Sequence, residues 1–441
     1  MGLKPSNISV VTLGCSKNVV DSETLVGQLR LGKAVVVNNV DDADTVVINT
    51  CGFIDAAKKE SIDAILEAVE RKNQGKLKKI VVVGCLSERF KSELVKEIPE
   101  VDAYFGSNQL PEVLANLGVD YKKELLGERV LSTPNHFAYL KISEGCDHPC
   151  SFCAIPLMRG KHRTKPREQV LAEARSLEAK GVKELILIGQ DSTYYGLDLY
   201  GEQQLASLLR ELSAVRGIEW IRLMYAFPSK FPSDLLEAYR DLPNLCRYID
   251  IPLQHASDGV LKSMRRGITN RAMRELLEKI RNAAPNMAVR TTFIVGYPNE
   301  SERDFQTLYD FVKEEKFHRL GVFTYSQETG TSADILGDPI PQKVKEERQK
   351  VIMELQRQIS EERNRALIGS TVKVLIDRPE NEFLVGRTEW DAPEIDQEVY
   401  VSNGDHQGPG SFCDVRIMDA TEYDLYGTRM SLRQQSQEDR R

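Results

Sequence analysis

Apolar and polar positions divide the chain into three blocks. The first block, residues 1–127, repeats short continuous apolar runs, each followed by a helical pattern. Continuous apolar runs are typical of strands that are buried on both faces of a parallel sheet. We therefore predict an α/β fold class, with a doubly wound parallel α/β domain in this block. Its predicted strands are 8–14, 45–50 and 79–84.

The second block, residues 131–367, also alternates strand and helix patterns. It contains six strand patterns, fewer than the eight β/α units of a closed TIM barrel. We predict an open, partial TIM-like (β/α)6 barrel, followed by a long charged helix from about Gln342 to Leu367. The predicted strands are 137–142, 184–190, 219–225, 247–253, 288–296 and 319–325.

The third block, residues 368–430, changes to short strand patterns separated by Gly, Asn and Pro turns. This pattern predicts a small antiparallel β-barrel. The last residues, 431–441, are polar, and we expect a disordered tail there.

The net charge of −7 is concentrated in the third block. Residues 366–430 contain thirteen acidic and five basic residues, whereas the rest of the chain is close to neutral. An acidic module repels nucleic acid and attracts a basic protein, because phosphate contacts dominate nucleic-acid affinity. We therefore predict a basic protein partner and no direct nucleic-acid role for this block. Asp391, Glu394 and Asp396 are the predicted recruiting acids; the alternative is an ordinary solvated surface.

Composition and hydropathy predict a soluble, cytoplasmic protein. Hydrophobic residues make up 41% and charged residues 28% of the chain, which is ordinary globular composition. No apolar run approaches the ~18 residues that span a bilayer, and the first residues lack the charged and apolar regions of a signal peptide. The eight cysteines are therefore expected in a reducing compartment, where disulfides are rare.

Three cysteines each come directly after a predicted strand of the first block, namely Cys15, Cys51 and Cys85. The carboxyl ends of parallel strands lie along one edge of a sheet. We therefore predict that these thiols converge on a shared ligand. The alternative is that they are small buried hydrophobic side chains. Cys246 and Cys413 follow no such pattern, and we interpret them as packing residues.

Three further cysteines form a C-x3-C-x2-C motif in a loop after the first predicted barrel strand. They are Cys146, Cys150 and Cys153. Three thiolates do not complete a tetrahedral zinc site, so a structural zinc would need His148 or His162 as a fourth ligand. Three cysteines on a 4Fe-4S cluster instead leave one iron open for a substrate or cofactor. A zinc-binding adaptor and a cluster enzyme both stay open on spacing alone.

The longer sequence SEGCDHPCSFCAIPLMRG (143–160) resembles the radical S-adenosylmethionine superfamily. Over essentially the whole chain, the sequence is similar to the methylthiotransferases of that superfamily. Their motifs match at TLGCSKNVVDSE (12–23), NTCGFID (49–55), GCL (84–86) and GRTEWDAPEIDQEVYV (386–401), the last within their C-terminal barrel, the TRAM domain. Lys165 and Asn299 depart from the family pattern, and neither replaces a cysteine.

The resemblance implies a radical reaction that uses two 4Fe-4S clusters. The C-x3-C-x2-C motif would hold the cluster that binds S-adenosyl-L-methionine, which is both radical source and methyl donor. The three strand-end cysteines would hold the cluster that delivers sulfur, and no separate acid or base is assigned. The implied substrate is the β-carbon of an aspartate of ribosomal protein S-twelve, free or in the small subunit; the alternative is an adenosine next to the tRNA anticodon. An electron donor such as flavodoxin or ferredoxin is also implied.

Additional cofactor-binding residues are predicted from their position after barrel strands, where such barrels place their sites. Asp191 could instead be a helix N-cap, and His255 an ordinary loop histidine. Arg159 is interpreted as facing the substrate or lying in a solvated turn. The predicted cofactor-binding residues are Gln190, Asp191, Gln254, His255 and Gly296.

Overall fold

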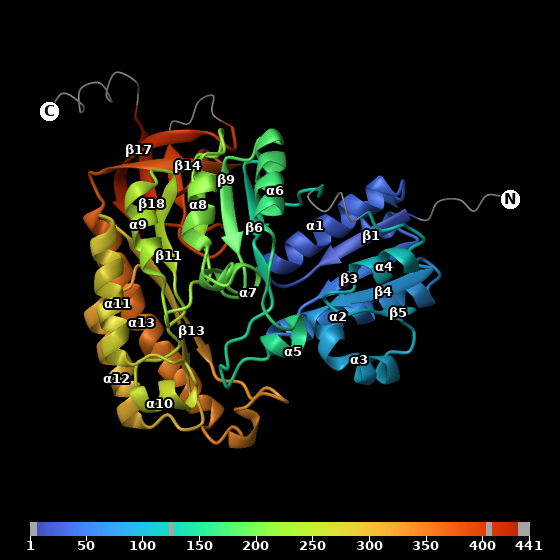
Figure 1. The fold of residues 1–441 in the computed structure, drawn as a ribbon, viewed down its shortest axis with the longest axis horizontal. Helices are drawn as coiled ribbons and strands as arrows, with labels where there is room; N and C mark the ends of the chain where they lie inside the picture. Colours follow the sequence, from blue (N-terminus) through green and yellow to red (C-terminus); the bar gives the residue numbers. More distant parts are fainter. Residues whose placement is uncertain (1–6, 123–127, 403–407, 431–441) are drawn as a thin grey trace.

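The computed structural model describes residues 7–122, 128–402 and 408–430. Figure 1 shows an N-terminal α/β unit (blue) beside a central sheet, and a small C-terminal β-barrel (red) over one end of that sheet. The mixed α/β fold class is therefore confirmed. The tail predicted at 431–441 lies outside the described residues.

The N-terminal sheet is parallel and five-stranded, in the order β2-β1-β3-β4-β5. The three predicted strands form its centre, and β3 is buried along its whole length, as its continuous apolar sequence requires. Two strands of two residues each were not predicted, because they are too short to show a periodicity. The strands are β1 Asn7–Thr12, β2 Val35–Val36, β3 Thr45–Thr50, β4 Lys79–Gly84 and β5 Ala103–Tyr104; the helices are α1 Ser16–Leu31, α2 Asp55–Asn73, α3 Cys85–Glu97 and α4 Leu110–Asn116.

The central sheet contains the six predicted strands, in the order β13-β12-β11-β10-β9-β6. All neighbouring pairs are parallel, and the two outer strands do not pair, so the partial barrel is open as predicted. Helix α1 of the N-terminal unit packs against the edge strand β6. The strands are β6 Phe137–Lys141, β9 Glu184–Ile188, β10 Trp220–Leu223, β11 Leu245–Asp250, β12 Ala288–Val295 and β13 Arg319–Thr324.

Helices cover the outer face of this sheet. The predicted long helix forms as α13, which packs on β13. A two-stranded ribbon, β7 Ser143–Glu144 with β8 Arg163–Thr164, brackets the C-x3-C-x2-C loop. The helices are α5 Ile155–Arg159, α6 Arg167–Ala179, α7 Leu197–Tyr200, α8 Leu205–Ser213, α9 Ser233–Asp241, α10 Asp258–Ser263, α11 Asn270–Ala283, α12 Glu302–Glu315 and α13 Gln342–Ala366.

The C-terminal barrel is closed, in the order β14-β15-β16-β18-β17. The purely antiparallel prediction was wrong at one pair, because β16 and β18 are parallel. A closed ring with an odd number of strands cannot alternate direction throughout, so at least one neighbouring pair must be parallel. The strands are β14 Thr371–Glu380, β15 Phe383–Thr388, β16 Val399–Ser402, β17 Phe412–Ala420 and β18 Leu425–Arg429.

The C-terminal barrel packs against the amino ends of the central strands. Leu375 and Ala392 of the barrel join the apolar cluster that fills the inside of the central sheet. Arg222 on β10 lies between Glu184, at the start of β9, and the carbonyl oxygen of Glu389. The opposite ends of the central strands therefore stay available for a site.

Candidate functional site

The N-terminal cysteines lie at the carboxyl ends of three adjacent strands. Cys15 precedes α1, Cys51 directly follows β3, and Cys85 is the first residue of α3, after β4. The pKa of the Cys85 thiol is raised to about 11, mainly by burial; Arg159 acts to lower it, and the nearby Cys15 and Cys51 act to raise it. Cys15 is exposed, whereas the other two are buried. The structure thus brings this triad together at one sheet edge.

Glycine directly precedes three of the cysteines, and at each of these glycines the backbone lies close to a neighbouring segment. They are Gly14, Gly84 and Gly145. Gly14 has a φ of +90°, and a Cβ there would lie 2.6 Å from the Cβ of Cys51. Gly145, before Cys146, has a φ of +75°, and a Cβ there would lie 2.0 Å from the carbonyl oxygen of Lys161. Only glycine adopts this backbone region without strain and without a colliding side chain. The Gly-Cys dipeptide is therefore a local sequence signal of these cysteine sites.

The second triad lies in one loop between β7 and α5. Cys146, Cys150 and Cys153 are all partly buried, and burial raises the pKa of Cys146 and Cys153 to about 12. Backbone hydrogen bonds fix the loop, since Ser151 N donates to Met264 O at 3.0 Å and Ser151 O accepts from Ala333 N at 2.7 Å. The loop is therefore anchored to two segments more than 100 residues away in sequence.

Neither triad is arranged around a single ion. Within residues 7–122, 128–402 and 408–430, no three His, Cys, Asp or Glu side chains converge closely enough to hold one metal ion. The two candidate fourth zinc ligands have partners elsewhere. His148 bonds Asp191 at 2.6 Å, and His162 lies beside Thr164.

The N-terminal triad and the segment that follows the second triad are in contact across the boundary between the N-terminal unit and the central sheet. Cys85 packs in one apolar cluster with Ala154 and Met158, and Ala154 directly follows Cys153. Arg159, at the end of α5, donates from Nε to Cys85 Sγ at 3.1 Å. The interpretation of Arg159 as a solvated turn was wrong, because the residue is only 2% exposed.

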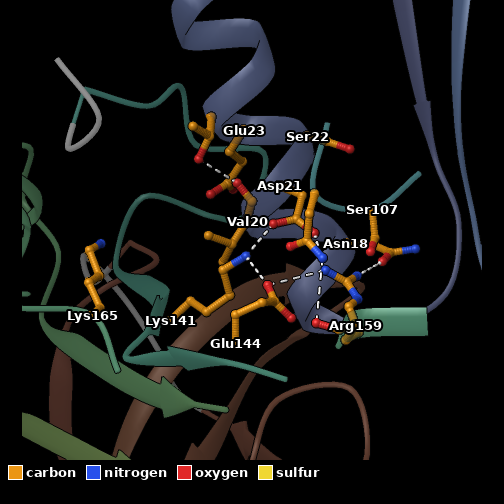
Figure 2. Close-up of polar contacts among 12 residues, drawn as sticks. Asn18, Val20, Asp21, Ser22, Glu23, Ser107, Lys141, Glu144, Arg159 and Lys165 are labelled. Carbon is orange, nitrogen blue, oxygen red and sulfur yellow. Dashed lines mark hydrogen bonds and ion pairs between the residues drawn. The ribbon is translucent and has the colours of Figure 1, made fainter. Parts of the chain in front are cut away.

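Arg159 belongs to a partly buried charge cluster that joins the two parts of the chain (Figure 2). Its guanidinium bonds Asp21 on α1 and Glu144 on β7. Lys141, at the end of β6, bonds the same two carboxylates. Gln190 Nε2 donates to Glu144 at 2.9 Å. Sequence reasoning missed these contacts because their members come from distant positions in the chain.

The predicted cofactor-binding residues differ in whether their polar side-chain atoms already have hydrogen-bond partners in the protein. Gln190 keeps a buried Oε1 without a partner among the described residues, whereas Asp191 caps the short helix at 192–194, as the alternative foresaw. His255 Nδ1 accepts from Ser257 N, while its buried Nε2 lies 3.6 Å from Glu300 and makes no hydrogen bond within the described residues. Gln190 and His255 therefore each keep a buried polar atom available to a cofactor, whereas Asp191 does not.

Gln254 and Gly296 follow β11 and β12. Gln254 has a φ of +74° and forms an isolated bridge with Phe293. Gly296 donates to Glu300, and the space that its missing side chain leaves is filled by Lys345. The absence of a side chain at Gly296 therefore lets Lys345 pack directly against the backbone.

Two of the three acids predicted to recruit a partner are buried. The side chain of Asp391 is fully buried and ion-paired with Arg319, the first residue of β13. The Asp396 side chain is 2% exposed and bonds Tyr248 and Arg290. The prediction of an exposed recruiting role was wrong for Asp391 and Asp396, because central-domain cations neutralise both.

Glu394 is exposed at the tip of the same loop. A sequence gives the sign of a charge but not its burial. The excess of acidic over basic residues in this block therefore overstates the negative charge on its surface. Cys246 and Cys413 are buried in apolar clusters, in agreement with their interpretation as packing residues.

Comparisons with family models place three known modules on the chain. The uncharacterised protein family UPF0004 matches residues 7–106, the radical SAM superfamily matches residues 140–312, and the TRAM domain matches residues 368–430. No helix among the described residues is long and apolar enough to cross a membrane.

Curated relatives match along nearly the whole chain. "Ribosomal protein uS12 methylthiotransferase RimO" of Christiangramia forsetii is 55% identical over 98% of this chain and 96% of its own length. The protein of the same name from Bacteroides thetaiotaomicron is 48% identical over 96% of this chain and 98% of its own length.

Solved structures at low identity share the fold. The methyltransferase TsrM of Kitasatospora setae, solved with cobalamin and a [4Fe-4S] cluster, is 14% identical, with a TM-score of 0.56 over 75% of this chain and 77% of that one. The cobalamin-dependent radical enzyme OxsB is also 14% identical, with a TM-score of 0.52 over 79% of this chain and 56% of that one.

Proposed function

The chain belongs to the RimO family of ribosomal protein uS12 methylthiotransferases, within the radical S-adenosylmethionine superfamily, and we propose that it adds a methylthio group to the β-carbon of an aspartate of uS12. uS12 is the small-subunit protein S-twelve. A β-C–H bond is not acidic enough for ordinary base catalysis at neutral pH, so a radical route suits this substrate. We assign no separate acid or base.

One observation carries the proposal, namely the contact of Cys85 with the segment that follows Cys153. Sulfur insertion needs the radical source and the sulfur carrier to act on one substrate carbon. The contact between Cys85 of one triad and the segment that follows the other triad is consistent with that requirement. A zinc adaptor has no need for such a junction.

The residues present fit two clusters. All six cysteines are free thiols, and each set of three leaves one iron of a cubane open. The loop set would hold the cluster that binds S-adenosylmethionine, and the strand-end set would hold a second cluster. When bound, these groups supply reductive cleavage of S-adenosylmethionine to a carbon radical and the sulfur atom to be inserted.

The chain's own residues orient these groups and exclude water from them. Arg266 Nη1 donates to Cys150 Sγ at 3.2 Å, which fixes that side chain. The buried amide oxygen of Gln190 is a free acceptor, in the described residues, for an amino group of the cofactor. Ala154 and Met158, both fully buried, form the apolar part of the junction beside Cys85. A dry site protects a radical from side reactions.

The choice of uS12 over tRNA rests on the relatives and not on charge. Burial of Asp391 and Asp396 removes much of the electrostatic argument for the C-terminal barrel. We divide the chain into a cluster domain at 1–127, a radical domain at 131–367 and a TRAM domain at 368–430. Flavodoxin or ferredoxin stays the predicted class of electron donor.

Anaerobic reconstitution followed by mass spectrometry tests the proposal. We expect a brown protein with about eight irons per chain, as two cubanes require, and a methylthio group on a single aspartate of uS12. An anticodon stem-loop RNA is the matched alternative substrate. A colourless zinc protein, or an enzyme that modifies the RNA and leaves uS12 untouched, would contradict the proposal.

A further inference from the structure

Arg159 reaches from the central domain into the N-terminal triad with every side-chain nitrogen engaged. Nε donates to Cys85 Sγ at 3.1 Å, and Nη1 donates to Asp21 Oδ2 at 2.6 Å and to Glu144 Oε2 at 3.3 Å. Nη2 donates to Asn18 Oδ1. Figure 2 shows this guanidinium between α1, which carries Asn18 and Asp21, and Glu144 of the central domain.

The contact with sulfur exceeds what a connection between domains requires. Asp21, Glu144 and Asn18 already satisfy the two Nη nitrogens. A neutral thiol is a weak acceptor, whereas a thiolate accepts a charge-assisted hydrogen bond that is about twice as strong as a neutral one. The Nε–H is therefore aimed at an atom that becomes a good acceptor once the cysteine is a metal ligand.

We propose that Arg159 is a positioning residue of the N-terminal cluster, which orients Cys85 and raises the reduction potential of the cluster through its hydrogen bond and its charge. This inference rests on the proposed function, since it needs a cluster at the strand-end cysteines. Hydrogen bonds to cluster sulfurs and nearby charge are known determinants of reduction potential. A donor and a positive charge stabilise the reduced cluster, which carries one more electron.

The surrounding charges predict the direction in which each substitution should shift the reduction potential. Arg159 and Lys141 face Asp21 and Glu144, so the charges of the buried Arg159 and of these three partly buried groups balance. Loss of Arg159 leaves an excess negative charge beside Cys85, whereas loss of the Asp21 charge leaves an excess positive charge. The two losses should shift the potential in opposite directions. A merely mechanical clamp would lose the same connection in either variant.

The chain offers a matched control at the other triad. Arg266 Nη1 donates to Cys150 Sγ at 3.2 Å, and its Nη2 donates to the carbonyl oxygen of Pro252. Its guanidinium also stacks over Phe227 at 4.2 Å. Arg266 thus makes the same kind of bond to sulfur, but to a cysteine of the other triad.

The test is a redox titration of the N-terminal cluster alone. The background is the full chain carrying Cys146→Ala, Cys150→Ala and Cys153→Ala, reconstituted anaerobically, so that only the strand-end triad holds a cluster. Into it go Arg159→Gln, Arg159→Lys, Asp21→Asn or Arg266→Gln, which in this background has no cysteine partner and therefore controls for the loss of an arginine alone. Iron content, the EPR spectrum of the reduced cluster and its midpoint potential are measured for each.

We expect Arg159→Gln to lower the midpoint potential, Asp21→Asn to raise it and Arg266→Gln to leave it unchanged. Arg159→Lys, which keeps the charge but loses the planar donor fork, should lie between Arg159→Gln and the parent. Iron content should stay near that of the parent.

Two results would overturn the inference. One is an unchanged potential in both Arg159→Gln and Asp21→Asn with full iron content. The other is equal loss of iron in both, which would make the contact a structural clamp only. If Arg159→Gln alone loses iron, the Asp21→Asn variant decides the question. A higher midpoint potential in Asp21→Asn supports the proposed role of Arg159, and an unchanged potential contradicts it. A parent that takes up no iron would instead refute the proposed second cluster.

Discussion

Ion pairs lie at both ends of the central sheet, whereas the two cysteine triads lie at its carboxyl end. At the amino end, Glu184 is ion-paired with Arg222 of β10 and with Arg387 of the C-terminal barrel. Asp391 of that barrel is ion-paired with Arg319 of β13. At the carboxyl end, the structure gathers free thiols and the unpartnered amide oxygen of Gln190. A barrel of this type uses one end for stability and the other for chemistry, and the contrast shows which mutations should affect which property.

The carboxyl end itself contains two different constructions. The loop triad comes from eight consecutive residues, Cys146 to Cys153, whereas the strand-end triad spans residues 15 to 85 and exists only when three strands pair. Metal binding at the second kind of site is coupled to folding of the whole domain.

The largest effects should come from removing one triad at a time. Changing Cys146, Cys150 and Cys153 to Ala should remove about half of the iron, since each cubane has its own ligands, and abolish cleavage of S-adenosylmethionine. Changing Cys15, Cys51 and Cys85 should spare cleavage but stop methylthiolation. Iron analysis and product chromatography measure both. Wild-type methylthiolation by the second variant would refute the two-cluster assignment.

A large loss of stability, without loss of a cluster, should follow from Asp391→Asn at the amino end. The change leaves the partly buried guanidinium of Arg319 without its direct ion-pair partner, a loss that costs up to roughly 3–5 kcal/mol in buried pairs. Denaturant unfolding measures the loss, and iron content should not change. The exposed neighbour Glu394 supplies the control, because Glu394→Gln should alter stability by less than about 0.5 kcal/mol. Equal effects of the two variants would contradict the burial argument.

Gly14→Ala should selectively impair the strand-end cluster. The new Cβ would lie 2.6 Å from Cys51 Cβ at a φ of +90°, so Cys15 and Cys51 would have to separate. Gly118 has a φ of +74° with open space around it, so Gly118→Ala should cost only the strain, roughly 1–2 kcal/mol. Iron content distinguishes the two. Full iron in Gly14→Ala would show that the close approach is not required.

The smallest expected effect is a pH dependence at the amino end. Burial alone would raise the pKa of Asp377, but the hydrogen bond from His136 and the guanidinium of Arg387 outweigh it and hold the pKa below its ordinary value. A lowered pKa stabilises the fold above the unfolded value of about 3.9 and loses that effect as the pH falls further. Asp377→Asn should therefore lower the unfolding free energy by about 1–2 kcal/mol at pH 7. The difference should shrink below about pH 3.9; a constant difference down to pH 2 would contradict the assignment.

The sequence by itself determined the fold class and the position of three cysteines at strand ends. Continuous apolar runs are local signals, so the three central strands of the N-terminal sheet and all six of the central sheet were predicted from them. Strand-end position then placed Cys15, Cys51 and Cys85 along one edge, because parallel strands share a direction.

Only the tertiary structure decided which charges are buried and which elements close the barrel. Asp391 is paired with Arg319, which is 72 residues away in the sequence, and Arg159 bonds Cys85, which is 74 residues away. No local pattern encodes such a pairing, since it depends on how separately folded sheets dock. The two-residue strands β2 and β5 and the parallel pair of β16 and β18 have the same origin, because neighbouring strands and ring closure define them, whereas periodicity does not.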